Sequence, residues 1–145
     1  MPSLRNDERT AYVRALYQLV AERARHRCEY CRAPEAILNL AFEVEHIVPG
    51  SRGGADDESN CALSCRSCNL YKSNQLDGQN EITASTFRLF HPRHDRSDDH
   101  FRVDTASGRI IGLTSVARAT VSALQMNREN QLAARIQWIR IGIYP

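Results

Sequence analysis

The chain has 145 residues, of which 42% are hydrophobic and 25% are charged, and its formal net charge is +2. This length and composition are typical of one globular domain with a buried core. No apolar run approaches the roughly 18 residues that cross a membrane. The opening MPSLRNDERT also lacks the apolar segment of a secretory signal. We therefore expect a cytoplasmic protein with no membrane partner.

The first element in chain order is a predicted amphipathic helix over residues 7–25. Its apolar residues recur at helical spacing between Tyr12 and Val20, with arginine and glutamate on the other face. Asn6 is the expected N-cap, although the position three residues later holds Arg9 rather than the glutamate of a capping box.

Two short strands follow, over residues 41–48 and 61–64. The first alternates between apolar and polar residues, and the loop between the strands, residues 49–60, is rich in Gly, Ser, Asp and Asn. A helix is expected to begin near Asn69, and residues 76–83 are expected to be irregular. The remaining predicted elements are a loop over 87–101, a hairpin pairing 101–104 with 109–112, and helices over 114–126 and 129–141.

Four of the five cysteines form two CxxC pairs, Cys28 with Cys31 and Cys65 with Cys68. Two thiolates at this spacing can chelate one ion from a single turn, and two such turns complete a tetrahedral sulfur site suited to zinc. One CxxC alone would also suit redox chemistry, but two in a cytosolic chain favour a metal over disulfides. With all four positions taken by cysteine, the zinc would be structural. Cys61 is expected to be a small buried residue of its strand.

The basic residues are lopsided, because 18 of the 19 are arginine and only Lys72 is lysine. The planar arginine fork matches phosphate oxygens, so this bias suits contact with nucleic acid. A G·C-rich genome produces the same bias through its codons. The arginine content is therefore consistent with both explanations.

Four short sequence motifs lie in and around the two cysteine pairs: Glu45-His46-Ile-Val-Pro, Gly53-Gly54, Asn60-Cys-Ala-Leu and Cys65-Arg-Ser-Cys68-Asn69-Leu-Tyr-Lys72. Their order and spacing resemble the HNH nuclease family, whose core is the ββα-metal fold. The resemblance implies an α+β protein with a four-cysteine zinc. Its expected parts, within a single domain, are an N-terminal helix (1–27), a zinc-stapled ββα core (28–75) and a C-terminal extension of hairpin and helices packed on the core (76–145).

The resemblance also implies the roles of four polar residues. His46 would be the general base, Asn60 the catalytic-motif residue that braces the loop, and Glu45 and Asn69 the ligands of Mg²⁺ or Mn²⁺. A histidine pKa of about 6.5 leaves a neutral ring that can accept a proton from water. Two protein oxygens, with waters and phosphate completing the shell, suit Mg²⁺, and Asn at position 69 disfavours zinc or nickel there.

Strand geometry adds a constraint on this site. Glu45 and His46 are adjacent, so in a regular strand their side chains point to opposite faces. We therefore expect Glu45 to take the metal and His46 the water, with a bend near Pro49 that lets both reach one phosphate.

These assignments predict a metal-dependent endonuclease that hydrolyses DNA, double-stranded in preference to single-stranded. The resemblance implies products with 5′-phosphate and 3′-hydroxyl ends. Arg52, Arg66 and Lys72 are expected to contact the nucleic acid, the alternative for each being a solvated side chain. Two other classes of function stay open: a non-catalytic zinc-stabilised nucleic-acid-binding module and a protein-interaction domain. The sequence leaves the target and the oligomeric state open.

Overall fold

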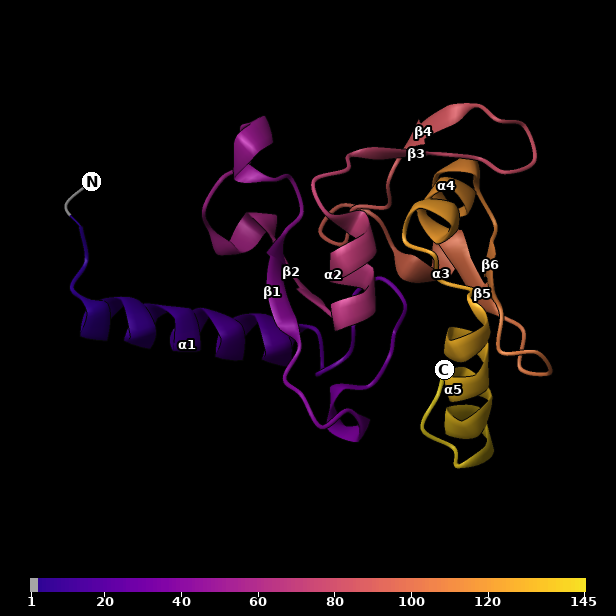
Figure 1. The fold of residues 1–145 in the computed structure, drawn as a ribbon, viewed down its shortest axis with the longest axis horizontal. Coiled ribbons are helices and arrows are strands. Elements are labelled where there is room, and N and C mark those ends of the chain that lie inside the picture. Colours follow the sequence, from indigo (N-terminus) through magenta and orange to yellow (C-terminus); the bar gives the residue numbers. More distant parts are fainter. Residues whose placement is uncertain (1–2) are drawn as a thin grey trace.

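The computed structural model describes residues 3–145 (Figure 1). The chain begins with the helix α1 (Asn6–Arg23), close to the predicted range. Its N-cap is Arg5 and not Asn6 as the sequence led us to expect. The reason is Glu8, whose carboxylate accepts a hydrogen bond of 3.0 Å from the Arg5 backbone N–H and so closes a capping box one residue earlier.

Only the C-terminal end of α1 packs on the rest of the molecule. Val20 and Ala21 are fully buried there, whereas Tyr12 is 46% and Leu19 is 43% exposed. From the strands β1 (Glu43–His46) and β2 (Cys61–Ser64), the helix extends away on the side opposite the C-terminal half of the chain (Figure 1). The prediction of a helix is correct, and part of its apolar face is exposed.

The central unit is an antiparallel strand pair followed by a helix. Strand β1 (Glu43–His46) pairs with β2 (Cys61–Ser64), with His46 opposite Cys61, and α2 (Arg66–Lys72) follows directly. The second strand has the predicted bounds, and Cys61 is buried as expected. The helix begins three residues earlier than predicted, because the Cys65 sulfur caps it by accepting from the Cys68 N–H. Short 3₁₀ turns occupy Glu35–Ile37, Gly50–Arg52 and Glu58–Asn60.

The segment after α2 contains a hairpin that the sequence did not predict. Strand β3 (Asp77–Gln79) pairs antiparallel with β4 (Thr86–Arg88), so the prediction of an irregular segment over 76–83 is wrong. The strands are three residues long and polar, hence no alternation marks them. Tertiary packing defines them instead: a Cβ added at Gly78 would lie 2.7 Å from the Ala119 carbonyl oxygen.

The remaining elements follow the predicted order, apart from the short helix α3 (Ser97–His100) within the expected loop. Strands β5 (Phe101–Val103) and β6 (Ile110–Gly112) form the predicted hairpin, and α4 (Ser115–Ala123) and α5 (Glu129–Arg140) the predicted helices. The combination of helices with two-stranded antiparallel sheets confirms the α+β class. Among residues 3–145, no helix is long and apolar enough to cross a membrane.

Side chains just before α5 and at the chain end contact the central unit. The Arg128 guanidinium donates to the Ser67 hydroxyl at 2.9 Å and lies 4.6 Å from the centre of the Tyr71 ring, both on α2. The Tyr144 hydroxyl donates to the Cys31 carbonyl at 2.8 Å. These contacts place the extension against the cysteine-bearing segments.

Candidate metal sites and catalytic residues

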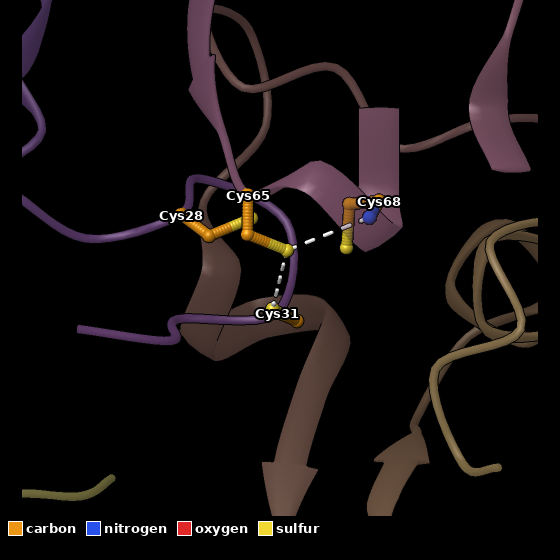
Figure 2. A group of neighbouring side chains, drawn as sticks. All are labelled: Cys28, Cys31, Cys65 and Cys68. Carbon is orange, nitrogen blue, oxygen red and sulfur yellow. Dashed lines mark hydrogen bonds between the residues drawn. The ribbon is translucent and has the colours of Figure 1, made fainter. Parts of the chain in front are cut away.

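The four cysteines of the two CxxC pairs come together at the base of α2 (Figure 2). Their sulfur atoms all lie within 4.8 Å of one another, and the Cys31 and Cys65 sulfurs are 3.7 Å apart. A tetrahedral zinc with Zn–S bonds of about 2.3 Å would separate its sulfur ligands by about 3.8 Å. The cluster therefore supports a structural zinc site.

The ionisation of each buried thiol depends on the other thiols of the cluster. Burial works to raise the pKa of Cys28, but hydrogen bonds from the other three thiols outweigh it and hold that pKa well below its usual range. Hydrogen bonding to Cys28 in turn raises the pKa of Cys31 and of Cys68. Without an ion the cluster therefore favours a single thiolate, at Cys28, and ionisation of all four thiols would require a compensating cation.

A second polar group lies between β1 and α2, where Glu45 and Lys72 form a buried ion pair. Their side chains are 4% and 2% exposed, and Lys72 Nζ lies 3.0 Å from Glu45 Oε2. The same ammonium donates to the Ile47 carbonyl at 2.9 Å and to the His46 carbonyl at 3.4 Å. Three oxygens thus converge on one cationic nitrogen.

The carboxylate of Glu45 is also held by Tyr30, whose hydroxyl donates to its other oxygen. Burial raises the pKa of Glu45, while Lys72 and Tyr30 act in the opposite direction. Burial, reinforced by the Glu45 charge, raises the pKa of Tyr30 well above its usual range. Tyr30 is therefore a neutral donor, and Lys72 supplies the charge that compensates Glu45.

Asn69 faces the same side of β1 as Lys72, because the two are three residues apart on α2. Its side-chain amide donates to Glu43, which also forms an ion pair with Arg66 at 2.7 Å. The structure thus brings Glu45 and Asn69, the predicted ligands, to one β1–α2 interface. In this conformation Glu45 is paired with Lys72, and Asn69 is hydrogen-bonded to Glu43.

His46 lies at the end of β1, and its ring is 41% exposed. Its Nε2 is 2.9 Å from Asp56 Oδ1, across the loop that joins the two strands. His46 and Asp56, together with Val44, line a groove of about 1210 Å³ between β1 and α1. Since Glu45 faces α2, the two adjacent residues occupy opposite faces of the strand, as predicted.

Asn60 braces the loop that carries Asp56. Its side-chain oxygen accepts from the Val48 N–H at 2.9 Å, and its amide donates to the carbonyls of Val48 and Ala55 at 2.9 and 2.8 Å. The loop passes so close to Val48 that a Cβ on Gly54 would lie 1.7 Å from the Val48 oxygen. This tight return is the bend after β1, and it brings Asp56 back to His46.

The three residues predicted to contact nucleic acid differ in their accessibility. Arg52 and Arg66 are exposed, on the loop and at the start of α2. Lys72 is buried, and its ammonium donates hydrogen bonds to Glu45 and to two backbone carbonyls. In this conformation its charge is not accessible to a nucleic acid, contrary to the expectation from the sequence.

Sequence reasoning missed three partners of the site: Tyr30, Glu43 and Asp56. Tyr30 lies inside the first CxxC pair and Glu43 is two residues from Glu45 on the same strand face, so strand periodicity could have indicated Glu43. Asp56 is ten residues from His46 in a loop without periodicity. No sequence pattern marks it.

A family model described as HNH endonuclease matches residues 28–75. This match confirms the predicted resemblance over the segment that holds both CxxC pairs and His46, and we refer to residues 28–75 as the HNH-type segment. Residues 76–145 lie outside the match. No curated protein and no solved structure gives a significant match to the chain.

Proposed function

We propose that the protein is a metal-dependent HNH endonuclease that hydrolyses phosphodiester bonds in DNA. The observation that carries this proposal is the partly exposed His46–Asp56 pair, set at a braced bend inside the HNH-type segment. A histidine oriented by a carboxylate and open to solvent is the arrangement that general-base catalysis requires. The four-cysteine cluster would hold a structural zinc.

The hydrogen bond to Asp56 defines which ring nitrogen acts. A proton on Nε2 is donated to the carboxylate, so Nδ1 of His46 is the free acceptor. Nδ1 takes a proton from water, the resulting hydroxide attacks phosphorus, and the bond from phosphorus to the 3′ oxygen breaks. The leaving oxygen takes a proton from solvent, which gives 5′-phosphate and 3′-hydroxyl ends. Asn60 keeps the bend, and hence Asp56, in register with the ring.

Glu45 and Asn69 are the residues we propose to hold Mg²⁺ or Mn²⁺, since they lie together between β1 and α2 and offer one charged and one neutral oxygen. The bound ion would neutralise charge on the phosphate and on the leaving oxygen. The oxygens around Lys72 Nζ fit a hard cation, because they already surround a positive charge. Arg52 and Arg66 would contact the phosphates of double-stranded DNA.

A non-catalytic nucleic-acid-binding module is the second candidate function. The observation that favours it is the ion pair of Glu45 with Lys72, which satisfies the carboxylate without any metal. Such a module would use the exposed arginines and the zinc-stapled scaffold alone. It would have no use for an oriented histidine.

The test is nicking of supercoiled plasmid in Mg²⁺ or Mn²⁺ by the wild type and by His46→Ala. We expect His46→Ala to lower the nicking rate by about 100-fold or more, because it removes the general base. His94→Ala removes an exposed histidine outside the matched segment and should nick at the wild-type rate. Zinc content and melting temperature should be equal in all three proteins.

Equal nicking by the wild type and His46→Ala would refute the catalytic role of His46. If neither protein nicks DNA while both retard it in a gel, the binding module is the correct function. Asp56→Asn gives a finer check, because it keeps the shape of the side chain but weakens the orientation of the ring. Its rate should lie between those of the wild type and His46→Ala.

A further inference from the structure

Between β1 and α2, three oxygens surround the Lys72 ammonium: one carboxylate oxygen of Glu45 and the carbonyl oxygens of His46 and Ile47. We call this group of oxygens the cradle. We propose that Lys72 and the divalent cation compete for this cradle, so that an ion binding at Glu45 releases the Lys72 ammonium to solvent. This inference rests on the metal site proposed above, but not on nuclease activity.

The cradle has the chemistry of a hard-cation site. Lys72 Nζ is surrounded by a carboxylate oxygen at 3.0 Å and by the carbonyl oxygens of Ile47 and His46 at 2.9 and 3.4 Å. Carboxylate and carbonyl oxygens are the ligands that Mg²⁺ and Ca²⁺ take in proteins. The ammonium therefore occupies a position that an ion at Glu45 would need.

Both cations cannot share the cradle. The Lys72 and Glu45 side chains are 2% and 4% exposed, so little solvent screens one charge from another there. A divalent ion on the Glu45 carboxylate would lie within a few ångströms of Nζ and repel it. Charge balance in the buried site requires that the ammonium leave when the ion enters.

The position of Lys72 on α2 makes this departure straightforward. It is the last residue of the helix, and Ser73 after it has a positive φ of 49° that ends the helical path. The four-carbon lysine stem is flexible and can turn outward without unwinding a helix turn. Asn69, one turn earlier, keeps its place and remains able to offer its side-chain oxygen.

Lys72 is the only lysine of the chain, so an amine-selective reagent reports on it without ambiguity. The experiment is acetylation of the zinc-loaded wild type by an N-hydroxysuccinimide ester, with peptide mass spectrometry of the Lys72 peptide. Without divalent cation, we expect labelling to be at least tenfold slower than in the chain unfolded by guanidinium. With saturating Mn²⁺, labelling should rise at least fivefold. Free Nα-acetyl-lysine in the same tube corrects for any effect of Mn²⁺ on the reagent.

Glu45→Gln is the matched control, because it removes the charge that attracts either cation. Its Lys72 labelling should not respond to Mn²⁺. Lys72→Met removes the competitor and should bind Mn²⁺ at least tenfold more tightly than the wild type, as measured by electron paramagnetic resonance. If a variant does not fold, the labelling of the wild type with and without Mn²⁺ still tests whether the ion releases Lys72.

Unchanged or slower labelling of the wild type in Mn²⁺ would overturn the inference, and so would a rise that persists in Glu45→Gln. The outcome is separable from that of the nicking assay. Nicking without release of Lys72 would leave the nuclease proposal standing and refute the competition. Release without nicking would refute the nuclease proposal and leave the competition standing.

Discussion

The HNH-type segment and the C-terminal extension bury different kinds of side chain. Between residues 28 and 75 the largest fully buried side chains are Tyr30, Lys72 and Leu63, beside the four cysteines of the two CxxC pairs, whereas in the extension they are Arg135, Leu124 and Met126. The first region contains a compensated buried charge and a four-cysteine cluster that supports a structural zinc site. The second depends on apolar packing, with Arg135 tying α5 to the Gly108 carbonyl at 2.6 Å. Stability in the two regions should therefore respond to different changes.

The largest expected effect comes from Cys28→Ser, which removes one zinc ligand. A structural zinc contributes about 10 kcal/mol or more of apparent folding free energy, so the segment 28–75 should unfold and zinc should be lost. Elemental analysis should give about one zinc per chain in the wild type. Hydrogen exchange should show lost protection in β1, β2 and α2, with α4 protected longer. Simultaneous loss in both regions would break the contrast between them.

Leu124→Ala tests the extension in the same way. Leu124 is 1% exposed, and its truncation should lower the free energy of unfolding by about 3 kcal/mol. Zinc content should not change, because Leu124 is not a member of the four-cysteine group. Ile141→Ala, at a position 67% exposed, is the control and should have little effect. Denaturant melts of both variants provide the measurement.

The smallest effect is expected at the joint between the regions. Arg128→Ala removes the hydrogen bond to Ser67 and the contact with the Tyr71 ring, at a cost of about 1–2 kcal/mol. Arg140→Ala, at an exposed position at the C-terminal end of α5, is the matched control. Chemical denaturation would measure both. A loss of zinc in Arg128→Ala would mean that the two regions form one cooperative unit, against the contrast proposed here.

Much of the HNH-type segment could be predicted from the sequence, because its signals are local. The CxxC spacing indicated the sulfur cluster, and the bounds of β2 followed from a short apolar run between turn residues. The opposite orientation of Glu45 and His46 followed from strand alternation. The assignments of catalytic and metal-binding roles to these residues stay predictions.

What could not be predicted depends on contacts between distant parts of the chain. Lysine is almost always exposed, so only the folded arrangement reveals that Lys72 is buried against Glu45. The β3–β4 hairpin follows from the close approach of Gly78 to α4, which no strand propensity encodes. The exposure of Tyr12 and Val13 on α1 reflects the lack of a packed layer over the first turns, which helical spacing alone does not reveal.

Asn60 holds Val48 and Ala55 together through its side-chain hydrogen bonds. The shape of the bend therefore does not depend on the length of the turn between these two residues. The enclosed residues 50–53 include Gly50, around which an added Cβ would meet no atom within 4 Å. Lengthening a closed loop adds loop-closure entropy only slowly, roughly 0.6 kcal/mol for each doubling. Insertions or new side chains at this turn would therefore change the exposed surface beside His46 while the Asn60 hydrogen bonds keep the bend in place.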